Sequence, residues 1–285
     1  MTPQKSVKVG VHVSIAGSIC NAFSRAKELN CDCFQIFTKN PRGWQAKPLT
    51  DEDSRIFVKE LESFGSDHVF AHVSYLPNLA GDKPDMYQKS VQGFCIELIR
   101  CEQLRIPFLV THLGHAADDL LKGRKRVAQA LNLALNKISG NCMILLENTA
   151  GEKHSVGSTF DDIADVIGQC QEPSRIGVCF DTCHGFAAGY DLRDDHSVGV
   201  VADMIEDTIG ISHIRLIHLN DTKGDLGSGL DRHEHIGLGI LGKEGIRAVL
   251  HEPGFSGIPL ICETPVDDRR GDRENIYQVR QLAKS

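Results

Sequence analysis

The sequence lacks the long apolar stretches that place a chain in a membrane. No segment approaches the roughly 20 consecutive apolar residues that a bilayer-spanning helix needs. Residues 1–5 contain none of the apolar run that opens a secretory signal. We therefore expect a soluble, cytoplasmic protein without a membrane partner.

Low-complexity runs and long blocks of like charge are missing as well, so no segment has the composition of a disordered arm. Of the 285 residues, 41% are hydrophobic and 24% are charged, which is typical of a globular protein with a large core. This length suits one α/β barrel of about 250 residues or two small domains equally well. The pattern along the chain has to separate the two.

Cysteines are numerous but lack the paired spacing of a thiolate zinc site. Cys31-x-Cys33 and Cys179-x3-Cys183 have no matching second pair. Several of the ten cysteines lie inside apolar runs: Cys33, Cys142, Cys179 and Cys262. We expect buried free thiols rather than disulfides, because a chain of this length needs no covalent stapling.

An excess of basic residues is also lacking. The chain has 31 Lys and Arg against 38 Asp and Glu, which gives a formal net charge of −7. Taken alone, this balance argues against a nucleic-acid partner, since binding to phosphates normally depends on surplus Lys and Arg. Bound cations, however, are not part of a sequence charge.

Eight short runs are apolar almost throughout, as expected of parallel strands buried on both faces. They are residues 7–13, 33–37, 68–73, 108–113, 142–146, 176–180, 214–219 and 258–262. Helix-like stretches lie between them, at residues 18–29, 87–104, 122–139, 160–171, 197–209 and 243–251.

Strand and helix therefore alternate, and no linker rich in Pro, Gly or Ser interrupts them. We predict an α/β fold, a single (β/α)8 TIM barrel that forms one domain over residues 1–285. An open doubly wound sheet is less favoured, because no Gly-x-Gly-x-x-Gly motif follows the first run.

Acidic and histidine side chains stand at the ends of most of the runs. They are His12, His72, His112, Glu147, Asp181, His218 and Glu263. Because the carboxyl ends of barrel strands meet on one face, we expect these side chains to converge there. Burying them together without counter-charge would cost roughly several kcal/mol per group, so the pattern indicates bound metal or a dense ion network, and metal is the better interpretation.

Two local motifs add candidates. His184 follows Asp181 by three residues, in the turn that leaves the strand. In Asp231-Arg-His233 an acid and an imidazole stand two apart, a spacing that aims both side chains the same way in extended backbone. The candidate metal ligands are His72, His112, Glu147, Asp181, His184, His218, Asp231, His233 and Glu263, on the C-terminal face of the strands.

One ion cannot use so many ligands. Imidazoles mixed with carboxylates suit zinc, and also manganese or iron(II). At three to four ligands per ion the set can hold two or three ions with open positions. Three divalent ions would leave the mouth of the barrel with a local charge of about +2, which favours an anionic substrate, and clustered divalent ions are typical of phosphodiester hydrolysis.

Nine ordered segments carry a resemblance to a known family. They are Val11-His-Val-Ser-Ile-Ala-Gly17, Phe37-Thr-Lys-Asn-Pro-Arg42, His72-Val-Ser-Tyr-Leu76, Leu146-Glu-Asn-Thr-Ala-Gly151, Gly177-Val-Cys-Phe-Asp-Thr-Cys-His184, Phe186-Ala-Ala-Gly-Tyr-Asp-Leu192, His218-Leu-Asn-Asp221, Asp231-Arg-His233 and Leu260-Ile-Cys-Glu-Thr264. From His12 to Glu263 the chain resembles the endonuclease IV family of apurinic/apyrimidinic endonucleases.

The resemblance implies a zinc-dependent deoxyribonuclease with three zinc ions, and it divides the nine candidates into three ligand sets. The sets are His72, His112 and Glu147; Glu147, Asp181, His218 and Glu263; and His184, Asp231 and His233. Glu147 would bridge two ions and position the nucleophile. The implied catalytic carboxylates are Glu147, Asp181 and Glu263.

The same resemblance implies double-stranded DNA with an abasic site as the substrate, bound by a monomer. Hydrolysis 5′ to the lesion would leave a 3′-hydroxyl and a 5′-deoxyribose phosphate, with 3′-end trimming as a further activity. Arg42, Tyr75 and Leu76 would enter the duplex where a missing base makes deformation least costly. Basic candidates for phosphate contacts are Lys39, Arg42, Lys223 and Arg232.

Two departures from the family pattern concern these DNA contacts. Leu113-Gly-His115 stands where Pro-Gly-Ser is usual, and Gly229 stands where a basic residue often precedes Asp-Arg-His. Two other functions remain open. A sugar isomerase would need about two ions and a Lys or His acid/base, and a non-catalytic binder of DNA lesions would use zinc only for its structure.

Overall fold

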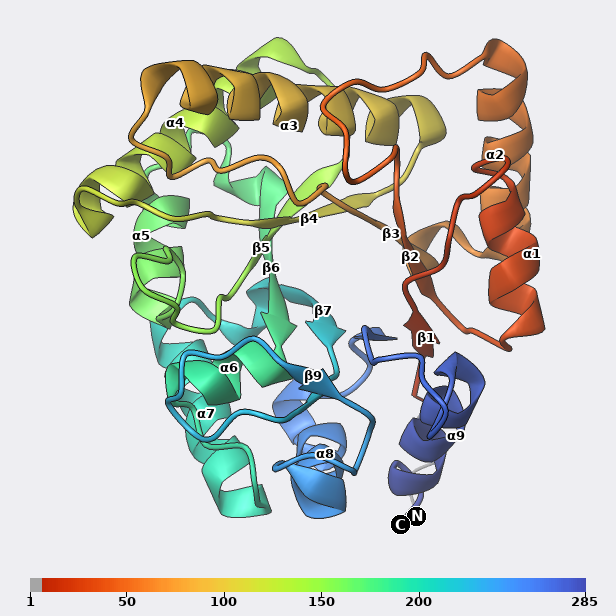
Figure 1. Ribbon diagram of the computed structural model, residues 1–285, viewed down its shortest axis with the longest axis vertical. Helices are drawn as coiled ribbons and strands as arrows, with labels where there is room; N and C mark the ends of the chain where they lie inside the picture. Colours follow the sequence, from red (N-terminus) through yellow and green to blue (C-terminus); the bar gives the residue numbers. More distant parts are fainter. Residues whose placement is uncertain (1–6) are drawn as a thin grey trace.

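A computed structural model describes residues 7–285. Eight parallel strands form its centre, bonded in the order β1-β10-β7-β6-β5-β4-β3-β2, and helices surround them (Figure 1). The strands are β1 (Val9–Val11), β2 (Phe34–Phe37), β3 (Val69–His72), β4 (Phe108–His112), β5 (Met143–Glu147), β6 (Ile176–Asp181), β7 (Ile214–His218) and β10 (Leu260–Cys262). Each predicted apolar run coincides with one of them, although β5 and β6 extend one residue beyond their runs, and the predicted TIM barrel is confirmed.

Nine α-helices lie within residues 7–285. They are α1 (Asn21–Glu28), α2 (Asp51–Phe64), α3 (Pro84–Leu104), α4 (Leu120–Lys137), α5 (Phe160–Gly168), α6 (Thr182–Ala188), α7 (Asp195–Thr208), α8 (Gly242–His251) and α9 (Asp272–Leu282). The sequence predicted six of these and missed α2, α6 and α9. The start of α2 carried a readable signal, because the side chain of Thr50 caps the helix by accepting a hydrogen bond from the Asp53 amide at 3.0 Å.

An apolar layer fills the barrel interior. Six of its members lie in β3, β4, β5, β6, β7 and β10, and the seventh directly precedes β2. In chain order they are Cys33, Phe70, Val110, Leu145, Cys179, Leu216 and Ile261. Side chains two apart on a strand share a face, so the residue two positions further on in each strand forms the next layer up. That next layer is Gln35, His72, His112, Glu147, Asp181, His218 and Glu263.

The barrel closes between β1 and β2. The two strands share a single parallel bridge, between His12 and Gln35. Two backbone hydrogen bonds flank it, from the Val13 amide to the Gln35 carbonyl at 2.8 Å and from the Asp32 amide to the Val9 carbonyl at 2.9 Å. The seam therefore brings the first strand against the second and places His12 beside the polar layer.

Two other expectations concern membranes and thiols. Among residues 7–285, no helix combines the length and the apolar character needed to cross a bilayer. All ten cysteines are free, and nine of them are buried, in agreement with the prediction of free thiols.

Candidate metal centre

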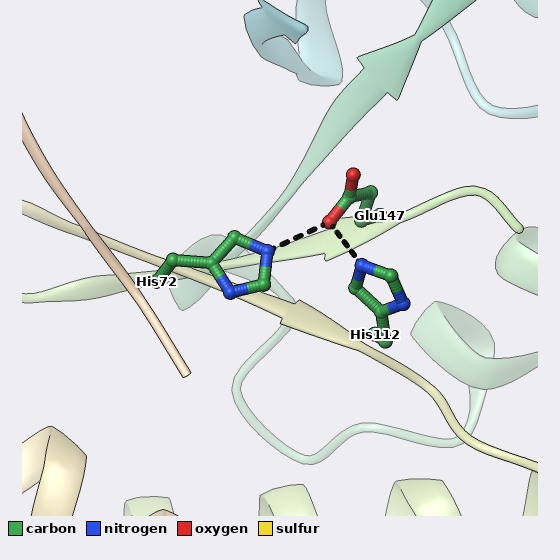
Figure 2. A group of neighbouring side chains, drawn as sticks. All are labelled: His72, His112 and Glu147. Atoms are coloured by element: carbon green, nitrogen blue, oxygen red, sulfur yellow. Dashed lines mark hydrogen bonds and ion pairs between the residues drawn. The ribbon is translucent and has the colours of Figure 1, made fainter. Parts of the chain in front are cut away.

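Glu147 lies at the centre of the polar layer and is fully buried. Its Oε2 atom is 3.0 Å from Nε2 of His72 and 3.0 Å from Nε2 of His112, so two imidazoles from neighbouring strands point at one carboxylate oxygen (Figure 2). The other oxygen, Oε1, is 2.9 Å from Nδ1 of His218. The two oxygens of one carboxylate thus face two different groups of imidazoles.

A second group gathers around His218. Its Nδ1 atom lies 3.3 Å from Oε2 of Glu263 and 3.8 Å from Oδ2 of Asp181. Candidate ligand atoms of Glu147, Asp181, His218 and Glu263 all lie within 4.8 Å of one another. Asn220 holds the arrangement in place, because its Nδ2 donates to Asp181 at 2.7 Å and its Oδ1 accepts from the Glu263 amide at 2.8 Å.

A third group lies toward the rim. Asp181 caps the start of α6 by accepting a hydrogen bond from the His184 amide at 2.8 Å, which fixes His184 beside the strand end. The small antiparallel pair of β8 (Asp221–Thr222) and β9 (His233–Glu234) brings His233 back over the mouth. Asp231 Oδ1 is then 3.4 Å from His184 Nε2 and 3.1 Å from His233 Nε2.

Hydrogen bonds on the far side of three rings set which nitrogen faces the carboxylates. Nδ1 of His72 lies 2.7 Å from the Val73 carbonyl, and Nδ1 of His184 lies 2.9 Å from the Asn148 carbonyl. Nδ1 of His233 lies 3.0 Å from the carbonyl of Glu263. Since a carbonyl only accepts, Nδ1 carries the proton, and in the neutral ring the Nε2 lone pair points at carboxylate oxygens.

Gln35 fixes the tautomer of His218 in a similar way, but in this ring Nε2 carries the proton. Its Oε1 accepts from Nε2 of His218 at 2.9 Å, which leaves the Nδ1 lone pair directed at Glu147. Its Nε2 donates to Glu263 Oε1 at 2.8 Å and to Nδ1 of His12 at 3.1 Å. A partner that orients the far nitrogen of a histidine is the usual companion of a metal-binding imidazole.

Lone pairs facing anionic oxygens repel unless positive charge lies between them, so the site needs protons or cations. Burial opposes a charge on His184, but the carboxylates around it, led by Asp181, raise its pKa well above the usual value. Burial likewise opposes protonation of His233, yet Asp231 and its neighbours raise the pKa of this ring to about 9. Burial would raise the pKa of Glu263, but His218 and other groups lower it to about 2.

These groups fit metal ions. Nε2 of His233 is buried and 3.1 Å from Asp231, yet it makes no hydrogen bond of good geometry within residues 7–285. Imidazole nitrogens and carboxylate oxygens are the donors that zinc takes in catalytic sites, and the three groups each offer three or four of them. The fixed tautomers leave a defined ring nitrogen facing each group, and a ring that is protonated in the absence of metal releases that proton when it coordinates an ion.

Two thiols lie close to these groups. Cys179 stands with Glu147 and His218, and Cys183 stands with Asp181 and His233, each within 4.8 Å. Burial raises the pKa of both thiols to about 12, so they stay protonated and make poor metal ligands. The better candidate donors of the site are therefore nitrogen and oxygen atoms.

A hollow of about 620 Å³ opens onto the metal-ligand candidates. Besides His72, His112 and His184, its walls include Tyr75, Lys223 and Arg232. The Tyr75 side chain stands out of the surface at 74% exposure, with its ring 5.2 Å from that of Phe37. An extended anionic molecule could reach the polar layer past these aromatic and basic side chains.

The proposed DNA contacts divide into two kinds. Arg42, Tyr75 and Arg232 are exposed, and Leu76 is half-buried in the loop after β3. Lys39 differs from the expectation, because it is only 5% exposed and its Nζ donates to the Gly43 carbonyl at 2.7 Å and to Ser74 Oγ at 2.9 Å. Its ammonium group is therefore bonded to the protein itself, unlike the exposed side chains of Arg42 and Arg232.

His12 lies beside Gln35 at the edge of the polar layer. Burial lowers the pKa of His12 to about 4, against the opposing effect of Glu263, so the ring is neutral at physiological pH. It packs on Phe37 with ring centroids 4.2 Å apart. Sequence reasoning missed Gln35, although it lies two residues after Cys33, the same spacing that links the interior layer to every ligand candidate on the barrel strands.

Several known proteins are similar to this chain in sequence and fold. Residues 23–283 match the family model described as xylose isomerase-like TIM barrel. A protein of Methanosphaerula palustris named "Probable endonuclease 4" is 51% identical over 281 residues, 97% of this chain and 98% of that protein. Endonuclease IV of Thermus thermophilus superposes with a TM-score of 0.86 at 31% identity, over 97% of this chain and 99% of that structure.

The same fold also occurs in a more distantly related protein of known structure. A D-tagatose 3-epimerase-like protein has a TM-score of 0.71 over 98% of both chains, at 16% sequence identity. At that identity the likeness establishes a common fold and nothing about activity. The close matches agree with the family resemblance of the ordered motifs, and the chain belongs to the endonuclease IV family within the xylose isomerase-like TIM barrels.

Proposed function

We propose that this protein is a DNA repair endonuclease that hydrolyses the phosphodiester 5′ to an abasic site in double-stranded DNA. The products are a 3′-hydroxyl and a 5′-deoxyribose phosphate, and the same chemistry trims blocked 3′ ends. The observation that carries the proposal is the gathering of three imidazole and carboxylate groups in one mouth. Membership of the endonuclease IV family supports the same substrate class.

Three zinc ions are the proposed cofactors, one for each group. The proposed sets are His72, His112 and Glu147; Glu147, Asp181, His218 and Glu263; and His184, Asp231 and His233. Zinc ions bound there would supply Lewis-acid stabilisation of the phosphodiester and acidify water near neutral pH. Three divalent charges also explain how a chain of net charge −7 accepts an anionic polymer.

The carboxylates Glu147, Asp181 and Glu263 are the proposed catalytic residues. Glu147 presents one oxygen to each of two groups, so it holds both at a fixed separation and orients the attacking water between them. Asp181 fixes His184 through its backbone cap, and Gln35 and Asn220 hold Glu263 in place. This preorganisation lets the site stabilise charge without rearranging during the reaction.

DNA recognition is assigned to the exposed side chains around the mouth. Tyr75 and Leu76 act as a wedge in the base stack, and Arg42 enters beside them. Unstacking costs a few kcal/mol, roughly, and costs least where a base is already missing, so selectivity for the lesion follows from deformation. Arg232 and Lys223 contact backbone phosphates. All the proposed ligands come from one chain, so a monomer is sufficient for the activity. We expect this monomer to act on DNA in the cytoplasm.

The proposal is tested on a labelled duplex that carries one abasic site. We expect a single cut 5′ to the site that disappears with a chelator and returns when zinc is added back. Tight binding of the lesion without a cut would indicate a non-catalytic binder. Turnover of a free aldose without nuclease activity would indicate a sugar isomerase. An intact duplex of the same sequence serves as the control substrate.

Removing one ligand of the rim group should remove one ion. Asp231→Asn is expected to lower the zinc content from about three to about two ions per chain and incision by at least about 100-fold, because His184 and His233 lose the anion between them. Metal analysis and incision rates check this. Asp225→Asn, an exposed acid of the same loop, is the matched control, and an Asp231→Asn protein with all three ions would contradict the assignment.

A further inference from the structure

A buried cluster of charged side chains lies beneath the loops that follow β2 and β3. Its members are Lys39, Glu97 and Arg100, with exposures of 5%, 0% and 8%. Glu97 and Arg100 both belong to α3, one turn apart, and Lys39 comes from the segment after β2. In Figure 1 the chain leaving β2 and the chain leaving β3 both run toward α3. We call these three residues the charged hub.

The charged hub donates hydrogen bonds to three backbone carbonyls of the first loop, residues 38–47. Lys39 Nζ donates to the carbonyl of Gly43 at 2.7 Å. Arg100 donates to the Thr38 carbonyl through Nε at 2.9 Å and Nη2 at 2.6 Å, and to the Lys47 carbonyl through Nη1 at 2.8 Å. The backbone on both sides of Arg42 is therefore fixed from below.

The hub also bonds to the second loop, residues 73–77. Lys39 Nζ donates to Ser74 Oγ at 2.9 Å, and Glu97 Oε1 accepts from the Ser74 amide at 3.3 Å. Glu97 ties the loops together, because Oε1 lies 3.3 Å from Lys39 Nζ and Oε2 accepts a hydrogen bond from Thr38 Oγ1. Ser74 directly precedes Tyr75, so the hub lies under the proposed wedge.

We propose that the charged hub positions the two DNA-facing loops relative to each other, so that Arg42 and the Tyr75-Leu76 wedge enter the duplex as one unit. Lys39, Glu97 and Arg100 are positioning residues for lesion recognition and touch neither DNA nor metal. This inference rests on the proposed function, in which those two loops meet the lesion. It adds residues on a helix behind the barrel mouth to the determinants of specificity.

Energetics favour positioning over stabilisation as the role of the hub. Taking charges out of water costs roughly several kcal/mol per ion, and replacing a buried pair by apolar residues of similar volume often leaves stability unchanged or improves it. What an apolar pair cannot supply is the set of directed hydrogen bonds to Gly43, Ser74 and Thr38. A fully bonded buried network specifies one arrangement of the backbone around it.

The test is a double variant, Lys39→Met with Glu97→Leu, which removes both charges of the pair and their bonds to Thr38, Gly43 and Ser74, while the bonds of Arg100 to the first loop remain. We expect its melting temperature to stay close to that of the parent protein. The rate on a small activated phosphodiester, bis(p-nitrophenyl) phosphate, should be unchanged, because the metal-ligand candidates are untouched. On the abasic duplex, KM should rise about 10- to 100-fold with a smaller change in kcat, since misplaced contacts away from the reacting atoms weaken recognition.

The matched control is Lys27→Met with Glu60→Leu. This pair has a similar separation, 3.1 Å, but lies on the exposed faces of α1 and α2. It should leave incision of the abasic duplex unchanged. Hydrogen exchange of the DNA-free proteins gives a second readout, because the amides of residues 42–45 and 74–76 should exchange faster in the hub variant alone.

The outcomes of these experiments distinguish failure of the positioning role from failure of the proposed function. A hub variant that keeps its melting temperature, its slow exchange and its KM for the abasic duplex overturns the inference. If the double variant does not fold, Ser74→Ala removes one acceptor of Lys39 without touching the ion pair and should raise KM and loop exchange at unchanged stability. If the parent protein cleaves the small diester but not the abasic duplex, the proposed substrate fails, while the exchange data still test the hub.

Discussion

Glu147→Gln should abolish incision of an abasic duplex, with a fall of at least about 1,000-fold in kcat, while the fold remains intact. Gln has the shape of Glu and still offers hydrogen bonds to the surrounding rings. However, Gln supplies one neutral carbonyl oxygen in place of two anionic oxygens. It therefore cannot present negative charge both to His72 and His112 and to His218. The two groups would lose their common anchor.

The structure explains why no neighbour can take over the part of Glu147. Glu263 and Asp181 approach His218 but do not contact the pair formed by His72 and His112 within ion-pair distance in the described residues. Burial would raise the pKa of Glu147, yet His112 and His218 hold it well below the usual value, so the carboxylate is charged whenever the site operates. The substitution thus removes a charge that the site is built around.

Incision rate, metal content and a thermal melt measured on one preparation separate loss of chemistry from loss of structure. Glu62→Gln is the matched control, because this acid on α2 is largely exposed and, within the part of the chain that the structure describes, forms an ion pair with Arg105 alone, at 3.7 Å. It should behave as the parent protein. A Glu147→Gln enzyme that is fully active would refute the assignment of Glu147 as the bridging carboxylate.

The barrel and the ligand candidates were accessible to sequence reasoning for one physical reason. Parallel strands buried on both faces are apolar throughout, so a polar residue at the end of such a strand stands out. The barrel then brings those ends together, and His72, Glu147 and His218 come within ion-pair distance although more than 70 positions separate neighbours in this set. The readable signal was therefore an acid or a histidine at the end of an apolar run.

Lys39 shows where the same reasoning fails. A lysine in a segment rich in polar residues predicts a solvated charge that is free to contact a phosphate, yet the Lys39 side chain is buried. Its burial depends on Glu97, 58 positions away on a helix, and nothing in the local sequence reveals that partner. Gln35 was missed for a different reason, because an amide is not a metal ligand, although its place in the strand is that of one.

Gly10→Ala should be among the most destabilising single substitutions in the chain, with a loss of about 4 kcal/mol or more. A Cβ atom at this position would lie 1.6 Å from the carbonyl oxygen of Cys33 and 2.7 Å from its carbonyl carbon. Both are backbone atoms of the next strand, so no side-chain rotation relieves the overlap. On the other side of β1, Gly10 is paired with Ile261, which prevents β1 from moving away.

Denaturant unfolding measures this loss, and Gly199→Ala provides the matched control. Gly199 lies inside α7, nothing comes within 4 Å of an added Cβ, and alanine is the better helix former, so this change should stabilise by about 0.5–1 kcal/mol. If Gly10→Ala unfolds within about 1 kcal/mol of the parent protein, the close approach of β1 to β2 is not what closes the barrel.

The seam at Gly10 also connects stability to the metal centre. Two positions beyond it, His12 bridges to Gln35 and accepts a hydrogen bond from its side chain, and Gln35 in turn orients His218 and Glu263. Pushing β1 and β2 apart would carry Gln35 away from those ligands. Any Gly10→Ala protein that does fold should therefore hold the ion of the His218 group about 10- to 100-fold more weakly, while the rim group around Asp231 keeps its affinity.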